Sequence, residues 1–328
     1  MKKIIHIVLF ILIFQNVTAQ DGQLSYVYSS PLTINPASTG NIGEGKWRAM
    51  TTYRKQWSSF IDKGLVNYSF SFDAPFTSKR VALGAIFYNN SASNGAVKNI
   101  MGLVSFSYNA YLDHDSKTKI AFGIQAGFGQ KSFDPTKHTF DNQYVPGVGF
   151  DPTMDNREHF THTSVMYPDF NFGTLIFKEV KGNKKFFPWI GLSVFHLTEP
   201  NESFYESVSS KLSRKYIITT GSIIRTSETF SFMPHVLIMN QASVLQFNFG
   251  STFNVDFNKF TTLMFGGYIR NKDAGIAMLG IDYDRYTLQF VYDINTSTLN
   301  PVTRGFGGYE ITLKYLMTGD RRYQNKFF

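Results

Sequence analysis

The sequence predicts an all-β protein: an antiparallel transmembrane β-barrel of about 14 strands, with an irregular N-terminal periplasmic segment. Three observations support this prediction. The chain begins with a secretory signal, short segments with one apolar face recur along it, and the connections between these segments sort by length. All three are typical of bacterial outer-membrane barrels.

Residues 1–19 are predicted to be a signal peptide. Lys2 and Lys3 precede the apolar run Ile4–Phe14, and small residues then lead to Ala19. A basic head, an apolar core and a small-x-small cleavage site are the features of a secretory signal. The apolar run is too short for a transmembrane helix. We therefore expect cleavage after Ala19 and a mature, exported chain that begins at Gln20.

The composition excludes several classes of protein. There is no cysteine among the 328 residues, so neither a disulfide framework nor a thiolate metal site is possible. Aromatic residues make up 16% of the chain and charged residues 17%, whereas soluble domains average about 25% charged residues. The net charge of +8 is spread along the chain, so nucleic acid is not expected as a partner. After the signal, no apolar run approaches about 18 residues, which excludes helical membrane spans.

Residues 20–45 are expected to form the irregular periplasmic segment. Several prolines and Gly40 interrupt it, and these residues favour turns. Its end, Gly40–Lys46, has the glycine and lysine spacing of a phosphate loop. Trp47 stands where such a loop needs Ser or Thr, and no strand precedes it. We expect a turn that leads into the barrel and no nucleotide-binding site.

Residues 46–316 are expected to form the outer-membrane barrel. In Val244–Val255, bulky apolar residues at odd positions alternate with Gln246 and Asn248. Such alternation places one face against lipid and the other in the lumen. The polar faces carry Ser, Asn, Gln, Thr and Gly, which suit a narrow lumen better than the outside of a soluble sandwich. The expected strands are approximately Lys46–Trp57, Leu65–Ala74, Arg80–Asn89, Gly102–Leu112, Lys119–Gln130, Asp169–Lys178, Pro188–Leu197, Lys215–Thr226, Phe230–Ile238, Val244–Val255, Phe260–Arg270, Ala274–Asp282, Tyr286–Asp293 and Gly308–Leu316.

The connections between these strands differ in length by parity. The odd-numbered ones include long segments such as Asn90–Met101, Lys131–Pro168 and Thr198–Arg214. Most even-numbered ones are short, as at Ser227–Thr229. Outer-membrane barrels have short periplasmic turns and longer external loops, so the odd connections are expected to be external. Residues 317–328 are expected to form a polar C-terminal tail.

The longest loop, Lys131–Pro168, is expected to form a lid or a binding surface. It contains His138 and the pair His159 and His162. No glutamate or third ligand stands at a helical spacing from them. We therefore expect solvated histidines and no metal site.

No catalytic site is predicted. His196 and His235 lie near strand ends and serines are abundant, but no Gly-x-Ser-x-Gly motif occurs. Asp73 and Glu310 are acidic residues on otherwise neutral polar faces, and we expect them to bond within a lumen plug or to Arg and Lys partners. The alternative is a contact for a periplasmic partner.

The three tryptophans, Trp47, Trp57 and Trp189, lie near expected strand ends. Aromatic residues at strand ends form girdles at the two membrane interfaces of outer-membrane barrels. We expect the tryptophans to belong to such girdles. A carbohydrate-stacking platform is the alternative.

With the strands placed, the sequence resembles the PorP/SprF family of outer-membrane proteins in Bacteroidetes. The resemblance covers essentially the whole mature chain, although Tyr309 stands where the family usually has histidine. The matching stretches are, in order, Gln23–Tyr28, Ile34–Gly40, Tyr53–Trp57, Ser69–Pro75, Pro168–Gly173, Gly191–Leu197 with Pro200, Tyr292-Asp293 and Tyr309–Leu313.

The resemblance implies a non-enzymatic barrel, without a cofactor, that acts as an accessory or anchoring subunit for type IX protein secretion. It would help to display adhesins, including gliding-related cargo, at the cell outer membrane. The implied partners are outer-membrane lipid, the C-terminal signal domain of the cargo or adhesin, the periplasmic lipoprotein ring and translocon components. The partner-binding residues expected from the motifs are Asn35, Pro36, Gly40, Arg54, Trp57 and Asp73.

Two other functions remain open. One is an outer-membrane transport channel for fatty acids or small solutes. The other is a barrel lipase or protease, which would require a Ser/His pair at the edge of the lumen.

Overall fold

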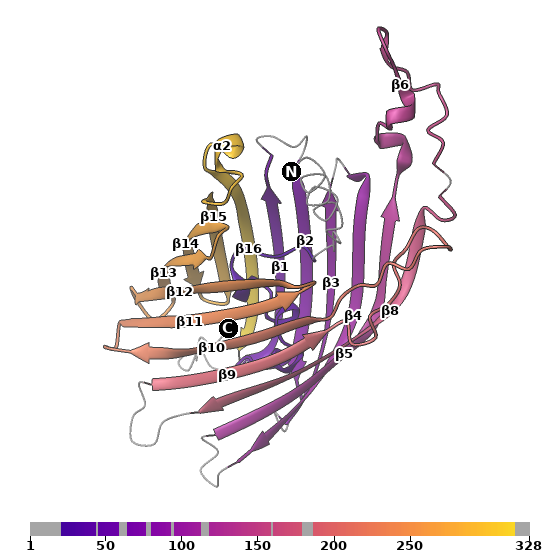
Figure 1. The fold of residues 1–328 in the computed structure, drawn as a ribbon. Helices are drawn as coiled ribbons and strands as arrows, with labels where there is room; N and C mark the ends of the chain where they lie inside the picture. Colours follow the sequence, from indigo (N-terminus) through magenta and orange to yellow (C-terminus); the bar gives the residue numbers. More distant parts are fainter. Residues whose placement is uncertain are drawn as a thin grey trace, which may run out of the picture.

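The chain forms one closed antiparallel barrel of fourteen strands in the computed structural model (Figure 1). The structure describes residues 21–43, 45–58, 64–76, 80–92, 95–112, 118–158, 160–178 and 186–318. The predicted signal peptide, and the expected tail from residue 319 onward, lie outside these ranges. Among the described residues, no helix is long and apolar enough to cross a bilayer.

The ring closes because β1 (Gly45–Gln56) pairs with β2 on one side and with β16 (Phe306–Thr318) on the other. Every other barrel strand pairs with its sequence neighbours. This arrangement confirms the predicted barrel. The other barrel strands are β2 (Leu65–Pro75), β3 (Val81–Ala92), β4 (Val97–Tyr111), β5 (Thr118–Phe133), β8 (Ser164–Lys178), β9 (Phe186–Phe195), β10 (Lys215–Arg225), β11 (Phe230–Gln241), β12 (Val244–Asp256), β13 (Thr261–Arg270), β14 (Ala274–Tyr283) and β15 (Tyr286–Asn295).

The two faces of the strands are assigned as the sequence predicts. On β4, Val104 is 64% exposed, whereas the neighbouring Ser105 is fully buried. On β12, Leu245 and Phe249 face outward and Asn248 is buried. The outer face is therefore the apolar, lipid-facing one, and the buried small polar residues line the lumen.

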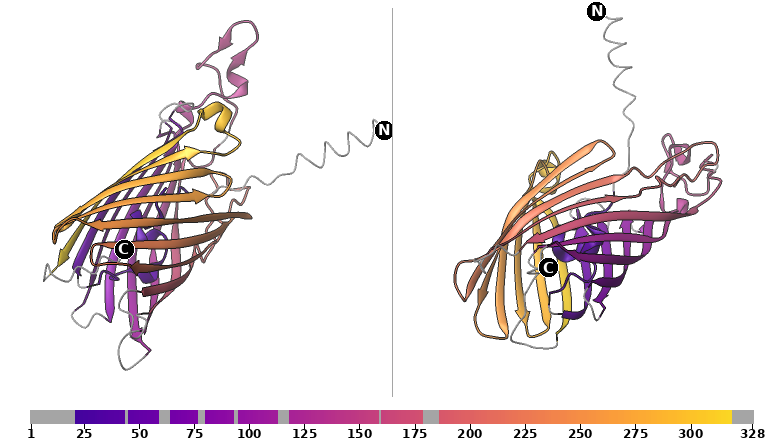
Figure 2. Two further views of the ribbon diagram at one scale, coloured as in Figure 1. Left: turned by 90° about the vertical axis from the view of Figure 1, so that its left-hand side faces the viewer. Right: turned by 90° about the horizontal axis from the view of Figure 1, so that it is seen from below.

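The long connections gather at one end of the barrel, which we call the external end. The longest, between β5 and β8, contains the turns Pro135–Lys137 and Asp141–Gln143 and the hairpin of β6 (Tyr144–Val145) and β7 (Gly149–Phe150), which projects away from the barrel (Figures 1 and 2). A short helix, α2 (Asn300–Thr303), lies in the connection between β15 and β16. Two external connections, Ala242–Ser243 and residues 271–273, are short turns.

The N-terminal segment is irregular, as predicted, but it lies inside the barrel and not in the periplasm (Figure 2). It forms three short 3-10 turns, Val27–Ser29, Pro31–Thr33 and Pro36–Ser38, and most of its residues are buried. Asp21 bonds residues at the external end, and the backbone at Gly40 approaches Pro75 at the opposite end. We call residues 21–43 the plug.

The location differs from the expected one because the plug matches the lumen chemically. Its small and hydroxyl-bearing residues find partners on polar lumen faces, which would otherwise hold unpaired groups away from bulk water. Ser25 and Ser29 are each at most 1% exposed, and their hydroxyls bond Arg54 and Glu310 of the wall. Fourteen strands thus enclose a filled interior.

One of the three tryptophans, Trp189, does not belong to the expected girdles. Trp47 stacks on Tyr315 with ring centroids 4.9 Å apart. Trp189 instead points into the lumen, is 3% exposed and packs edge-on against Tyr28 of the plug. Trp57 lies at the external end and lines a cavity there. Trp189 shares the lumen-facing parity of Gly191 and Ser193, which decides its side of the strand.

Candidate functional site: the plug and the external cavity

A flat seat for the plug is built from glycines on lumen faces. A Cβ added at Gly173 on β8 would lie 2.1 Å from the Oδ1 atom of Asn35, and one at Gly123 on β5 would lie 2.2 Å from the backbone of Pro36. No side chain fits at such distances. The chain carries glycine here because the plug backbone approaches the wall directly.

Asn35 anchors the plug turn to this seat. Its Nδ2 atom donates to the carbonyls of Thr174 at 2.8 Å and Leu192 at 3.3 Å, on β8 and β9. Its Oδ1 atom accepts from the N–H of Ala37 at 2.9 Å and so caps the turn that Pro36 begins. One carboxamide thus joins two strands to the plug. Pro36 suits the first position of the turn, because the backbone N–H that proline lacks would have no partner within the turn.

Asp73 on β2 binds the other end of the plug stretch Asn35–Gly40. Its Oδ2 atom accepts from the backbone N–H of Gly40 at 2.7 Å, and both carboxylate oxygens accept from Arg48 at 2.9 Å. Gly40 has φ of +66°, a conformation that favours glycine. Asp73 and Arg48 are fully buried. The bidentate pair is therefore desolvated and depends on its geometry.

Glu310 on β16 accepts two hydrogen bonds from the plug. The N–H of Ser25 donates at 2.6 Å, and the hydroxyl of Ser29 donates to the other carboxylate oxygen. Glu310 is fully buried. The prediction that Asp73 and Glu310 bond a lumen plug or cationic partners is confirmed.

Arg54 on β1 connects the plug to a second buried carboxylate. It donates to the carbonyl of Gln23 at 2.6 Å, to the hydroxyl of Ser25 at 2.7 Å and to Asp293 at 2.8 Å. Asp293 on β15 also accepts from Arg270 on β13 at 2.9 Å. Two guanidinium groups thus share one carboxylate at the external end of the lumen.

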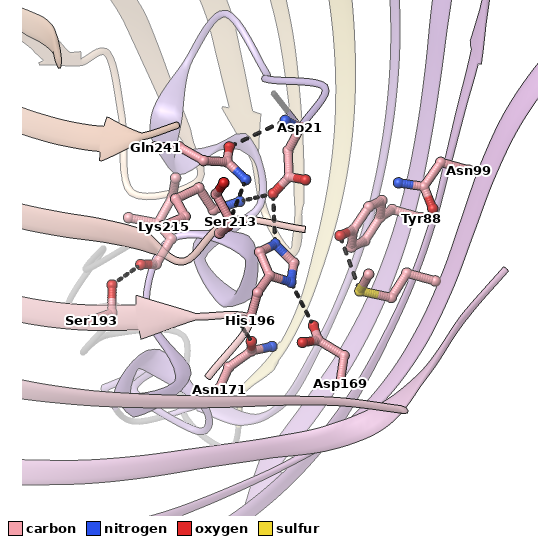
Figure 3. Close-up of polar contacts among 12 residues, drawn as sticks. Asp21, Tyr88, Asn99, Asp169, Asn171, Ser193, His196, Ser213, Lys215 and Gln241 are labelled. Carbon is pink, nitrogen blue, oxygen red and sulfur yellow. Dashed lines mark hydrogen bonds and ion pairs between the residues drawn. The ribbon is translucent and has the colours of Figure 1, made fainter. Parts of the chain in front are cut away.

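A second ionic cluster holds the start of the plug (Figure 3). The imidazole of His196 lies between two carboxylates, with Nε2 2.8 Å from Asp21 and Nδ1 3.0 Å from Asp169. Lys215 donates to Asp21 at 2.5 Å. The paired residues of β8 and β9 run from Phe172 to Phe177. On the external side of this pairing, the side-chain cluster adds further links between the two strands.

The charges of this cluster fix the protonation of its members. Burial by itself lowers the pKa of His196, but the carboxylates of Asp21 and Asp169 outweigh it and raise that pKa to about 9. Burial would raise the pKa of Asp21, but Lys215 and His196 hold it well below its usual range. Near neutral pH, an imidazolium between two carboxylates therefore fastens the plug to the wall.

The middle of the plug packs in an aromatic cluster. Tyr28 contacts His235 on β11 edge-on, with ring centroids 4.9 Å apart, and Tyr26 contacts Tyr268 on β13 at 5.4 Å. Such contacts stabilise by area burial and by ring geometry. His235 thus packs among aromatic rings of the plug and the wall.

Neither His196 nor His235 forms a catalytic pair with a serine in the described part of the chain. Both ring nitrogens of His196 are bonded to carboxylates. Of the paired loop histidines, His162 is exposed and lies 3.6 Å from Glu206, and His159 is outside the described residues. The described ranges contain no group of three or more His, Asp or Glu side chains that could hold a metal ion.

Above the plug, the barrel opens into a cavity of about 830 Å³. The first plug residues, Asp21–Gln23, form part of its lining, together with the external ends of β1–β5, β12 and β13. Carboxamides are frequent in the lining, at Gln56, Asn67, Asn90, Asn99, Gln246 and Asn271. We call it the external cavity.

The structure brings five of the six predicted partner-binding residues together, but at the plug. Asn35, Pro36 and Gly40 belong to the plug itself, whereas Arg54 and Asp73 bind it from the wall. Trp57 is the exception, because it lines the external cavity. Binding of an external partner by these residues stays a prediction.

Sequence reasoning missed the residues that complete these clusters: Arg48, Asp21, Asp169, Arg270 and Asp293. Their partners are far away in the sequence, so spacing gives no signal for the pairs. One signal exists: Arg48 and Arg54 share the lumen-facing parity of Thr52. A cation on a narrow lumen face needs a buried acid nearby.

Two solved structures with a similar fold are described as toluene transporters. The toluene transporter TbuX of Ralstonia pickettii is 11% identical, with a TM-score of 0.50 over 88% of this chain and 93% of TbuX. The toluene transporter TodX of Pseudomonas putida is 10% identical, with a TM-score of 0.50 over 93% of this chain and 96% of TodX. At these identities the likeness concerns the fold alone.

Comparison at the sequence level is more specific. No curated protein sequence matches the chain. The family described as type IX secretion system membrane protein PorP/SprF matches residues 16–315, which include the plug and nearly the whole barrel. The chain is therefore an outer-membrane β-barrel that belongs to the PorP/SprF family of type IX secretion system membrane proteins.

Proposed function

We propose that this protein is a non-enzymatic accessory or anchoring subunit for type IX secretion, which holds adhesins at the cell surface. Gliding-related adhesins are included among the proposed cargo. The proposed partners are the C-terminal signal domain of the cargo on the external side, and the lipoprotein ring and translocon components on the periplasmic side. Outer-membrane lipid surrounds the barrel.

The observation that carries this proposal is the plug, in a member of a secretion-system family. Its turns contact strands on several sides of the lumen through hydrogen bonds and buried ion pairs. A filled barrel is a rigid element on which external loops and cavities keep their positions. This suits a support that binds a protein better than a pore that passes solutes.

Deletion of the gene tests the proposal. The expected result is loss of surface display of at least one adhesin, measured by protease shaving of intact cells and mass spectrometry, with restoration by the wild-type gene. A second measurement is co-purification of that adhesin with the tagged full-length barrel from solubilised outer membranes. Unchanged display of every type IX cargo would reject the function.

A transport channel is the second candidate, and the external cavity is the observation that favours it. Proteins with this fold include toluene transporters. Solute conduction would require a path past the plug. Uptake of radiolabelled toluene or octanoate by cells that carry or lack the gene tests this candidate, and a gene-dependent uptake rate would favour it.

A further inference from the structure

The loop between β5 and β8 stands on an aromatic base that it shares with the loop between β9 and β10. Phe133 packs against Phe160, with ring centroids 5.1 Å apart, and against Phe204 at 5.9 Å. Phe160 also packs against Tyr205 at 5.3 Å. The N–H of His162 donates to the carbonyl of Phe204 at 3.1 Å. The two loops therefore support each other at the external end of the barrel.

Beyond this base, residues 140–158 form a unit that we call the outer hairpin. It contains β6 and β7 and projects away from the barrel (Figures 1 and 2). Gln143 holds it together: its Oε1 atom accepts from the N–H of Phe140 at 3.2 Å, and its Nε2 atom donates to the carbonyl of Met154 at 3.0 Å. The N–H of Asp151 donates to the carbonyl of Gln143 at 2.8 Å. The outer hairpin thus presents its surface on a frame of its own hydrogen bonds.

The outer hairpin exposes large apolar side chains. Val148 is 81% exposed and Tyr144 is 65% exposed, and Phe150 and Met154 are also exposed. Tyr144 and Phe150 pair across the hairpin, so their side chains share a face. Exposed apolar residues of the barrel wall face lipid, but the outer hairpin extends beyond the wall (Figure 2). Apolar side chains gathered in water mark an interaction surface.

The charge of the outer hairpin favours a basic protein as the partner. Its acidic residues are Asp141, Asp151, Asp155 and Glu158, and its one basic residue is Arg157. Four acids and one base give a net charge of −3, whereas the whole chain carries +8. Anionic lipid headgroups attract basic segments and repel acidic ones, and a neutral glycan gains nothing from the charge. A protein face with basic residues around apolar side chains complements both features.

We propose that the outer hairpin binds a basic face of the C-terminal signal domain of the cargo, with Tyr144, Val148 and Phe150 against apolar side chains of that domain. This inference rests on the proposed function and adds which surface of the barrel meets the cargo. The acidic residues speed the encounter, and the apolar contacts hold the complex.

The first test measures whether the outer hairpin is covered in living cells. The chain contains no cysteine, so Val148→Cys introduces a single thiol for a membrane-impermeant maleimide. Cells that display the adhesin identified by the gene deletion are compared with cells that lack the adhesin gene. We expect labelling to be several-fold slower when the adhesin is present. Val302→Cys is the matched control, because Val302 is 59% exposed in α2 at the same end of the barrel, and its labelling rate should not depend on the adhesin.

The second test measures binding of the purified C-terminal domain of that adhesin to the full-length barrel in detergent. Tyr144→Ala should weaken binding about 10-fold, as expected for an aromatic contact residue. Asp141→Lys should lower the association rate several-fold at low salt, and high salt should lower the wild-type rate. Glu228→Lys is the matched charge reversal, because Glu228 is exposed in the turn between β10 and β11 at the opposite end. It should leave the association rate unchanged.

Three results would overturn the inference. Slow labelling of Val148→Cys with and without the adhesin would indicate that lipid or glycan covers the outer hairpin. Equally fast labelling in both strains, or a binding affinity that neither Tyr144→Ala nor Asp141→Lys alters, would show that the cargo does not contact it. If the adhesin domain still co-purifies with the barrel in these cases, the proposed function survives and the outer-hairpin site does not. If no adhesin depends on the gene for its display, both fail.

Discussion

The carboxylate of Asp73 accepts the backbone N–H of Gly40 at 2.7 Å, and this bond joins the wall of the barrel to the plug. The same carboxylate receives the guanidinium of Arg48. A buried acid therefore serves two partners, one on the neighbouring strand and one on the N-terminal segment. The closed interior depends on pairs of this kind.

Substitution of Asp73 tests this dependence. Asp73→Asn leaves Arg48 buried without a full countercharge, and loss of one partner of a buried pair costs about 3–5 kcal/mol. The free energy of unfolding in liposomes, measured by urea titration, should fall by an amount of this order. The double variant Arg48→Met with Asp73→Leu should lose less. Equal losses in the single and double variants would contradict the pairing.

The glycine seat predicts a position-specific effect of a single methyl group. Gly173→Ala places a Cβ 2.1 Å from Asn35, and overpacking of this kind costs about 1–3 kcal/mol. The thermal midpoint should fall and the plug should loosen. Gly102→Ala is the control, since a Cβ there meets no atom within 4 Å. Similar midpoints for both variants would show that the plug does not occupy the seat.

The ionic cluster predicts a pH dependence. The pKa of His196 is raised to about 9, from about 6.5 in the unfolded chain. Its contribution to stability is therefore complete below pH 6.5 and is lost as the pH rises to about 9. The difference in unfolding free energy between wild type and His196→Asn should shrink by about 3 kcal/mol across this window.

The control for this titration is His162→Asn, because His162 is exposed in the external loop. Its difference from wild type should stay near zero from pH 6 to pH 10. A pH-independent difference for His196→Asn would contradict an imidazolium between Asp21 and Asp169.

The predicted partner contact at Trp57 is testable apart from the plug. Trp57 lines the external cavity, and truncation of an aromatic contact at an interface typically costs about 1–3 kcal/mol. Trp57→Ala should lower the amount of adhesin that co-purifies with the barrel at least several-fold. Trp47→Ala, which removes the stacking on Tyr315, should lower it much less. Equal recovery with both variants would remove Trp57 from the partner site.

The sequence predicted the strands well because membrane strands repeat a local pattern. Period-two alternation assigned Leu245 and Asn248 to opposite faces without any knowledge of pairing, and hydrocarbon on one side enforces it. The lengths of the connections distinguished the two ends of the barrel for a similar local reason.

The position of the plug could not be predicted in this way. Ser25 and Ser29 bond Glu310, which lies 285 and 281 residues further along the chain, and no local spacing reports such a contact. Prolines and glycines in residues 20–45 indicated turns but not the surroundings of those turns. The isolated acids Asp73 and Glu310 were the useful signal, because buried carboxylates require donors.

Conductance in planar lipid bilayers tests the central claim, that residues 21–43 fill the lumen, most directly. The full-length mature protein should be closed, and a variant that lacks residues 21–40 should form open channels. Gly173→Ala should give intermediate, flickering conductance because its plug is displaced. Equal, steady conductance of the full-length protein and the deletion variant would contradict the filled barrel.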